Sequence, residues 1–291
     1  MMNTRFTAAL VAFVAAAFAS AADLCGDSPL KLTPYNAGTK GVFPVSSVLV
    51  SGAKEAILVN AQFGASQAQD VVQIVKDSGK TLTTIYIAHG DPDYYFGLET
   101  IHAAFPNASI VATAATVAHI NETAADKLKF WGPILGADAP NSTILPSILP
   151  SKTLTLEGRS LEIQGPTARS YVWIPDLKAV VDGVLVENNI HAFLADTQTP
   201  ESHVEWINAL EEIQARKPAV IVPGHALVGD VADIDAPAYT IKYIRDFDAE
   251  TPKAANSTFL IAAMKQLYPK AGSISSLEIS AAVAKGEMKW P

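Results

Sequence analysis

Apolar, strand-like runs alternate with helical patterns along most of the chain, which is typical of α/β proteins with layered sheets and helices. Apolar and β-branched runs predict strands at 47–50, 56–59, 84–87, 110–112, 153–156, 161–163, 171–174, 179–186 and 219–222. Apolar positions at helical spacing predict helices at 67–76, 98–105, 116–130 and 200–215, followed by a mostly helical end. The segment 132–151 is rich in Pro and Gly and is expected to form a long surface loop.

The first 21 residues are predicted to be a secretory signal peptide rather than part of the fold. Arg5 precedes an apolar run at 6–18, and Ala19-Ser20-Ala21 has the small residues of a cleavage site. The run is shorter than the roughly 20 residues of a membrane span, and no later segment is apolar enough to cross a bilayer. We therefore expect one domain at 22–291 of a protein that is secreted or held in the secretory lumen, or periplasmic if bacterial.

Composition narrows the class of protein further. Hydrophobic residues make up 49% of the chain and charged residues 17%, so it is expected to bury a core rather than stay disordered. Lys and Arg number 21 against 29 Asp and Glu, a net charge of -8, so no basic field draws in nucleic acid. A small-molecule substrate is the expected partner, and the sequence does not set the oligomeric state.

Two further features concern modification. N-x-S/T sequons favour a eukaryotic secretory route and a glycoprotein, with accidental sequons in a bacterial exported protein as the alternative. They lie at Asn107, Asn121, Asn141 and Asn256. Cys25 is the single cysteine, so it is either a free thiol or an intermolecular link.

Two predicted strands end in residues that can carry chemistry. His89, Asp91 and Asp93 follow the strand at 84–87 at alternate positions in a Gly/Pro turn, and His225 follows the strand at 219–222. Ligand sites of α/β proteins lie beyond the carboxyl ends of strands, so these side chains are candidate metal ligands or acid/base groups. The alternative for each is a loop residue that only forms hydrogen bonds.

Together these residues resemble the metallo-β-lactamase superfamily, which carries an H-x-H-x-D-H motif where this chain has His89-Gly90-Asp91-Pro92-Asp93-Tyr94. The resemblance covers most of the chain after the signal and includes 57–63, 82–99, 153–158, 172–181 and 222–225. It implies an αββα sandwich whose metal site lies at the shared edge of two central sheets. Periodicity alone indicates only an α/β fold.

The motif departs from the family pattern at several positions. His89 and Asp93 match the first histidine and the aspartate, whereas Asp91 and Tyr94 replace the second and last histidines. The final family ligand is matched by His225.

Later ligand positions are also changed. The family's G-H-T-x-x-S corresponds to 165–170, which places Pro166 at the histidine. The bridging aspartate falls on Val184, unless a shift in register lets Asp182 replace it, and Asn60 replaces an acidic residue at an early strand end.

These substitutions exclude a dinuclear zinc centre, because Pro and Val supply no ligand atoms. One divalent ion held by a subset of His89, Asp91, Asp93 and His225 stays possible, as does a site with no metal. The exchange of His for Asp shifts preference from zinc towards manganese, magnesium or iron.

The resemblance implies a secreted hydrolase of a small ester, lactone, amide or thioester, with Asp93 as the most important residue. The alternative is a metal-free isomerase, cyclase, dehydratase or lyase. In it Asp91 and Asp93 divide the acid and base roles, and the Tyr94 phenol donates to a substrate oxygen. A third hypothesis is a non-catalytic ligand-binding protein. His191 lies in a loop that borders the pocket in the family and is a candidate substrate contact.

Other charged and histidine side chains are expected to have no role in the chemistry. His102, His119 and His203 lie on predicted helices and are expected to be surface or capping groups. Arg169 could meet an anionic substrate, but the expectation is a solvated charge at a strand end.

Overall fold

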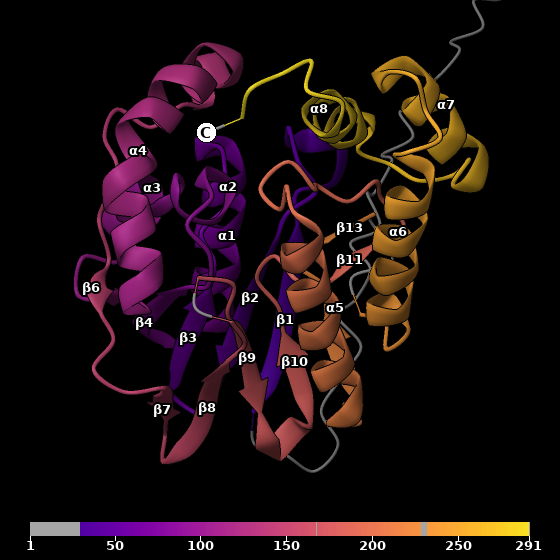
Figure 1. Cartoon of the computed structure of the whole chain (residues 1–291). Coiled ribbons are helices and arrows are strands. Elements are labelled where there is room, and N and C mark those ends of the chain that lie inside the picture. The colour runs from indigo at the N-terminus through magenta and orange to yellow at the C-terminus, as the bar shows by residue number, and fades with distance from the viewer. Residues whose placement is uncertain (1–29, 167, 228–231, 291) are drawn as a thin grey trace, which may run out of the picture.

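Two β-sheets pack face to face, and helices cover the outer face of each (Figure 1). The computed structural model describes residues 30–166, 168–227 and 232–290, so the predicted signal peptide and Cys25 lie outside the described residues. The first sheet has the order β1 (Lys31–Asn36), β2 (Ser46–Ser51), β3 (Glu55–Val59), β4 (Thr81–Ile87), β5 (Ser109–Ala112) and β6 (Ser147–Ile148). The second has the order β12 (Val220–Val222), β10 (Ala179–Val181), β9 (Tyr171–Ile174), β8 (Arg159–Gln164) and β7 (Thr153–Leu156). A short parallel pair joins β11 (Glu187–Asn188) to β13 (His225–Ala226).

Three apolar layers hold these elements together. Side chains of both sheets, among them Val50, Ile57, Leu161 and Val172, fill the layer between the sheets. A second layer joins the first sheet to α1 (Ala65–Ser78), α3 (Leu98–Ala104) and α4 (Ala114–Leu135). A third joins the second sheet to α5 (Pro200–Ala215), α6 (Ala236–Glu250), α7 (Ser257–Leu267) and α8 (Ile274–Ala284). The structure thus confirms the αββα sandwich.

Local sequence signals place several element boundaries. α1 buries Val71, Val72 and Val75 and ends at Gly79, whose φ of 66° is the left-handed conformation that glycine adopts easily. α5 begins at Pro200 after a capping box in which the Thr199 side chain accepts the N–H of Ser202. These elements match the predicted helices closely.

Two predictions at element ends are wrong for identifiable reasons. The loop expected at 132–151 begins later, because α4 continues through Pro133, with buried Trp131 packed on Phe43 and Phe63. The strand expected at 179–186 ends at Val181, because the Asp182 carboxylate accepts the N–H of Val186 at 2.6 Å and folds the chain into a turn.

Several short or irregular elements were not predicted from the sequence, among them β1 and α2. β1 contains Pro34 and lies at the edge of its sheet, where a proline is tolerated but weakens the strand pattern. α2 (Pro92–Tyr95) is a single turn. Of the helices formed by the described residues, none combines the length and apolar character needed to cross a membrane.

Candidate active site

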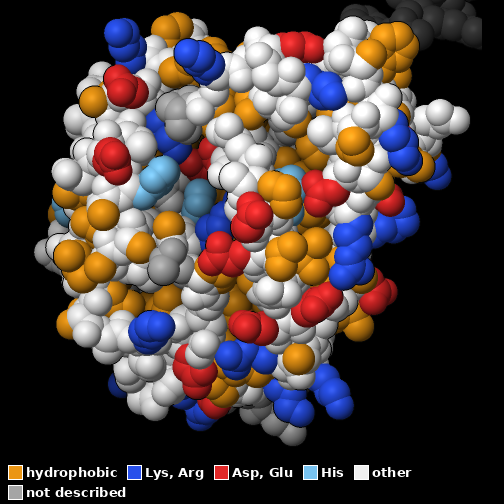
Figure 2. Space-filling view, in the orientation of Figure 1, with side chains coloured by type: hydrophobic (Ala, Val, Ile, Leu, Met, Phe, Trp, Pro, Cys, Tyr) orange, Lys and Arg blue, Asp and Glu red, His pale blue; other side chains and the backbone are white. Residues whose placement is uncertain are grey.

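The carboxyl ends of three strands meet at one edge of the sandwich and carry the predicted site residues. β4 ends at Ile87, just before His89, and β10 ends just before Asp182. β12 ends at Val222, shortly before His225, and runs parallel to β10, so their carboxyl ends point the same way. Figure 2 shows histidine side chains in a hollow of the surface, beside acidic and basic side chains.

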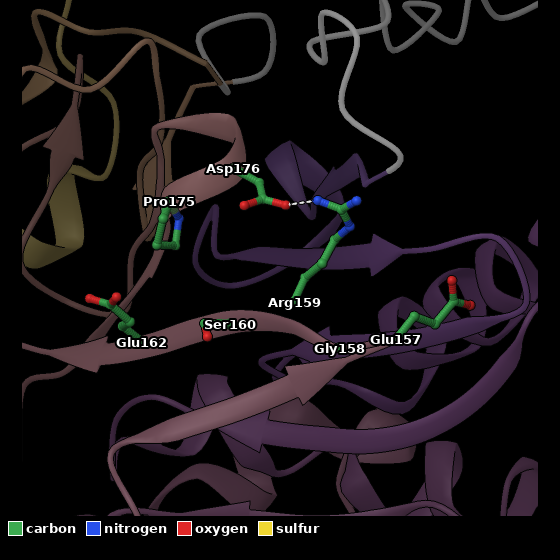
Figure 3. A pocket seen from close by; sticks show the side chains of 7 residues that line it. All are labelled: Glu157, Gly158, Arg159, Ser160, Glu162, Pro175 and Asp176. Atoms are coloured by element: carbon green, nitrogen blue, oxygen red, sulfur yellow. Dashed lines mark hydrogen bonds and ion pairs between the residues drawn. The ribbon is translucent and has the colours of Figure 1, made fainter.

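A different hollow, of about 440 Å³, lies at the opposite end of the sandwich, by the hairpin between β7 and β8 (Figure 3). Its charged groups are paired within the protein: Arg159 forms an ion pair with Asp176. The Glu157 carboxylate accepts the backbone N–H groups of Ala53, Lys54 and Glu55 at 2.9, 2.5 and 2.8 Å. These contacts fasten the hairpin to the turn before β3, which is a structural role.

The loop after β4 is held in place by backbone and ring contacts of His89. The His89 backbone pairs with Arg169 in an isolated antiparallel bridge, and the N–H of Ser170 donates to the Ala88 carbonyl at 3.3 Å. The N–H of Asp91 donates to Nδ1 of His89 at 3.2 Å. The loop therefore has one position relative to the segment before β9.

Asp93 and Tyr94 enter the site from α2. Pro92 occupies the first position of this helix, where its missing N–H costs nothing. All four residues of α2 are buried, and Tyr94 is completely covered. The short helix thus turns both functional side chains inward, towards His225.

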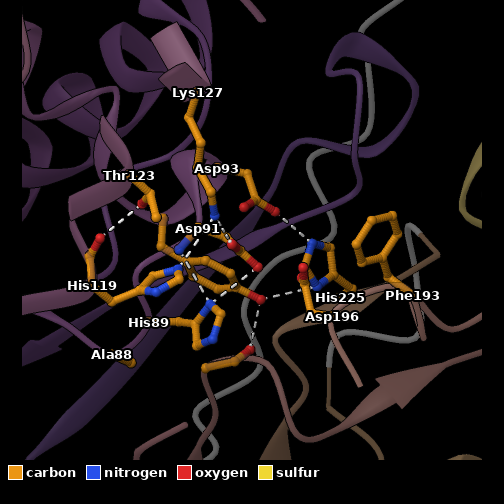
Figure 4. Close-up of polar contacts among 12 residues, drawn as sticks. Ala88, His89, Asp91, Asp93, His119, Thr123, Lys127, Phe193, Asp196 and His225 are labelled. Atoms are coloured by element: carbon orange, nitrogen blue, oxygen red, sulfur yellow. Dashed lines mark hydrogen bonds and ion pairs between the residues drawn. The ribbon is translucent and has the colours of Figure 1, made fainter. Parts of the chain in front are cut away.

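Asp93 and His225 form the first of two ion pairs at the site (Figure 4). Nε2 of His225 lies 2.8 Å from Oδ2 of Asp93, and Nδ1 lies 3.0 Å from the Tyr94 hydroxyl. That hydroxyl donates to the Gly183 carbonyl at 3.0 Å, so it accepts from Nδ1 of His225. Burial opposes a charge on His225, but the hydrogen bond and charge of Asp93 outweigh it and raise the pKa. His225 therefore bridges Asp93 and Tyr94, and its protonated form is stabilised there.

A glycine contact makes this bridge possible. The backbone of Gly224 passes so close to the Gly183 carbonyl that a Cβ at Gly224 would lie 1.4 Å from that oxygen. Any side chain there would force the two loops apart. Because the same carbonyl accepts the Tyr94 hydroxyl, Gly224 is needed for the position of Tyr94 as well as for the turn.

Lys127 and Asp91 form the second ion pair (Figure 4). The Lys127 ammonium donates to Oδ1 of Asp91, while Nδ1 of His89 lies 3.2 Å from Oδ2. Burial would raise the pKa of Asp91, but the charge and the hydrogen bond of Lys127 lower it well below its usual value. Burial likewise would lower the pKa of Lys127, but Asp91 raises it. Both groups are therefore charged at neutral pH.

His119 completes this side of the site. Its Nε2 lies 3.4 Å from Nζ of Lys127, and its ring centroid lies 6.3 Å from that of His89. Burial and the Lys127 charge lower the pKa of His119, so its imidazole is neutral at neutral pH. The expectation of a surface or capping role for His119 is wrong, because it faces the ion pair.

Asp196 and Trp290 lie at the rim of the site. The indole Nε1 of Trp290 donates to Oδ1 of Asp196 at 2.6 Å, and its ring packs edge-on against Phe130 and Phe193. The end of the chain is thus tied to the site by a carboxylate and two aromatic rings.

These features agree with comparisons with known proteins. The family model of the metallo-β-lactamase superfamily matches residues 41–225. The chain belongs to the metallo-β-lactamase superfamily. No functionally curated protein matches it.

Solved structures of the superfamily share the fold at low sequence identity. A family protein from Thermus thermophilus has a TM-score of 0.61 and 15% identity, covering 89% of this chain and 92% of its own. A metallo-β-lactamase from Pontibacter korlensis has a TM-score of 0.52 and 18% identity, covering 75% and 94%. The enzyme FIM-1 from Pseudomonas aeruginosa, in its mono-zinc form, has a TM-score of 0.51 and 18% identity, covering 74% and 90%.

Superfamily members usually bind zinc, but the residues of this member do not fit such a centre. Within 30–166, 168–227 and 232–290, no three His, Cys, Asp or Glu side chains are grouped to hold a metal ion. The Lys127 ammonium lies on Asp91 and would repel a divalent cation there. Both ring nitrogens of His225 form hydrogen bonds, one with Asp93 and one with Tyr94, so a metal ion would have to break one of them.

The two other changed ligand positions agree with this poor fit. Val184 belongs to the apolar layer beside α4, and the side chain of Pro166 has no atom that can bind a metal ion. The alternative residue, Asp182, is buried and uses Oδ2 on the N–H of Val186, while its Oδ1 has no partner among the described residues. Burial raises the pKa of Asp182 to about 7.

The structure brings five of the predicted site residues together and leaves one apart. His89, Asp91, Asp93, Tyr94 and His225 share the cluster described above. The predicted phenol donor is not free, because Tyr94 bonds to Gly183 and His225. His191 is fully buried, and its Nδ1 lies 3.0 Å from the Tyr243 hydroxyl of α6. A substrate contact at His191 stays a prediction.

His191 should instead make stability depend on pH. Burial lowers its pKa from 6.5 to about 4, so between these values the unfolded chain binds a proton that the folded chain does not. The free energy of unfolding should therefore fall by up to about 3 kcal/mol as pH falls from 7 to 4. Asn does not titrate, so in His191→Asn the free energy of unfolding, measured with urea, should not show this fall between pH 7 and pH 4. An equal difference between variant and wild type at both pH values would contradict it.

Sequence reasoning missed Lys127, His119, Asp196 and the setting of Arg169. One signal was available: His119, Thr123 and Lys127 recur every four residues on one face of the predicted helix. The Arg169 expectation is wrong, because its guanidinium stacks over Trp206 at 4.4 Å and is only partly exposed. His203 is buried too, with Nδ1 2.6 Å from the Asp248 carboxylate.

Proposed function

We propose that this superfamily member is an acid/base enzyme that acts on a small organic substrate without a metal ion. The observation that carries the proposal is the ion pair of Lys127 with Asp91. Asp91 stands at a position that holds a metal ligand in the family, and here the Lys127 ammonium takes the place of a metal ion beside it. Isomerisation, cyclisation, dehydration and elimination are the reaction classes that such a site favours, because they need proton transfer and a stabilised oxyanion but no activated water.

Asp93 is the proposed base. Its Oδ2 is bonded to His225, whereas its Oδ1 has no hydrogen-bond partner among the residues the structure describes. Oδ1 is therefore the oxygen left to take a proton from substrate. His225 and Tyr94 keep the carboxylate oriented, and the positive charge of Lys127 stabilises negative charge that develops on a substrate oxygen.

Hydrolysis of an ester, lactone, amide or thioester is the second candidate, favoured by the family positions of His89, Asp93 and His225. It would use at most one divalent ion, such as zinc, manganese or iron, on a subset of these residues and Asp91. Such an ion would have to displace Lys127 or His225 from its present partner. A non-catalytic ligand-binding protein is the third. The signal-like sequence at 1–21 supports a secreted location for each.

Proton NMR in D2O separates these candidates with one panel of small esters, lactones, thioesters and enolisable carbonyl compounds. We expect deuterium incorporation or rearrangement of at least one carbonyl compound, at the same rate before and after treatment with a chelator. Hydrolysis that the chelator abolishes and zinc restores would establish the second candidate instead. No reaction with any compound, by a folded protein, would favour the ligand-binding protein.

A further inference from the structure

We infer that Arg169 is a binding site for the carboxylate of the substrate, so that the substrate is a small organic acid. The inference rests on the proposed function only in treating this cluster as the substrate site. Nothing in the family match assigns a role to Arg169, which lies in the segment between β8 and β9.

The first observation is that the Arg169 guanidinium has no polar partner. Among the described residues it forms no hydrogen bond and no ion pair, and it lies over the Trp206 ring, 4.4 Å from the ring centroid. A guanidinium has five N–H donors, and leaving them unpaired in a partly buried place is costly. The side chain is partly exposed, so a ligand can reach these donors.

The second observation is that the guanidinium is held in position. The Arg169 backbone is bridged to His89, and the guanidinium carbon lies over the Trp206 ring. Trp206 is itself fixed, since it is 1% exposed and its Nε1 donates to the Leu185 carbonyl at 2.7 Å. A planar fork that is fixed in this way matches the two oxygens of a carboxylate.

Nearby charges select a singly charged ligand. The other two cations of the cluster are already paired, Lys127 with Asp91 and His225 with Asp93. Arg169 is the cation left for a ligand within the described cluster. The carboxylates of Asp196, Asp91 and Glu187 act on it only through space, and they would repel a dianionic phosphate more strongly than a carboxylate.

Aromatic side chains indicate what the rest of the ligand looks like. The Asp196 carboxylate interacts electrostatically with Arg169 and also accepts the indole N–H of Trp290. The Trp290 ring packs on Phe193, with 5.4 Å between the ring centroids. An apolar or aromatic body beside the carboxylate would pack against such rings. Benzoate is therefore a suitable probe, with benzamide as its uncharged isostere.

Calorimetric titration of the full chain with benzoate, benzamide and inorganic phosphate tests the inference without any turnover. We expect benzoate to bind about tenfold or more tighter than benzamide, and phosphate to bind more weakly than benzoate. Equal affinity for benzoate and benzamide, no benzoate binding, or tighter binding of phosphate would overturn the inference.

Variants locate the binding group. Arg169→Gln should weaken benzoate binding about tenfold or more, and Arg169→Lys, which keeps the charge but not the fork, should lose part of the affinity. Arg216→Gln is the matched control, because Arg216 also lies over a tryptophan, Trp173 at 5.6 Å, but already donates to the Tyr171 hydroxyl. Unchanged benzoate affinity in folded Arg169→Gln would overturn the inference. Because binding is measured directly, failure of the proposed chemistry would leave this result intact.

Discussion

Asp93→Asn is expected to lower kcat by about 10²- to 10⁴-fold, the usual contribution of a general acid or base. The amide keeps the size of the carboxylate, so α2 and the contact with His225 should persist. It cannot take a proton at Oδ1, which is the oxygen that the structure leaves unpaired within the described residues. The deuterium-exchange assay described above measures the loss, and circular dichroism checks the fold.

A matched control is present in the same protein. Asp248 and His203 form the same kind of Asp–His pair, with Oδ1 of Asp248 2.6 Å from Nδ1 of His203. This pair lies on the outer helices α5 and α6, away from the site. Asp248→Asn should leave kcat unchanged. A folded Asp93→Asn protein with full activity would show that the inherited carboxylate is vestigial and that the chemistry lies elsewhere.

Lys127→Met is expected to destabilise the fold by about 3 kcal/mol, because it leaves the carboxylate of Asp91 buried without its cation. The side chains of Lys127 and Asp91 are each only 16% exposed, so solvent screens the pair weakly. Chemical denaturation at pH 7 measures the change in the free energy of unfolding.

Two controls test whether this loss of stability comes from the buried ion pair: a double-mutant cycle of Lys127 with Asp91, and the removal of an ion pair that is exposed to solvent. Asp91→Asn combined with Lys127→Met should recover most of the lost stability, because no unpaired charge remains. Lys242→Met breaks a comparable pair with Asp246, but the Lys242 side chain is 66% exposed, so it should cost less than about 1 kcal/mol. Equal losses for Lys127→Met and Lys242→Met would contradict a buried ion pair at the site.

Most of the fold could be predicted because periodicity and local signals agree. The strand at 84–87 and the helix at 200–215 have clear apolar patterns and end signals, and both occur in the structure. β1 was missed because Pro34 interrupts its pattern. The end of β10 was missed because it depends on one hydrogen bond from Val186 to Asp182, which no pattern of apolar residues records.

The site divides in a similar way. Residues that follow a strand directly, such as His89, Asp91 and His225, could be predicted because strand ends meet at one edge of the sandwich. Lys127 was missed, although it shares one face of the predicted helix with His119 and Thr123, because its role depends on how α4 packs beside the loop after β4. The family pattern showed which metal ligands were lost. Only the packed structure shows that Lys127 forms an ion pair with Asp91, which occupies one of the family ligand positions.

Zinc titration of the metal-free chain and of Lys127→Met, followed by calorimetry and elemental analysis after dialysis, tests metal independence most directly. The wild-type chain should retain far less than one zinc ion, since Lys127 lies on Asp91 and Asp93 holds His225. Lys127→Met should bind zinc more tightly than wild type, because Asp91 then lacks its cation. One or two tightly held zinc ions in the wild-type chain would contradict the account.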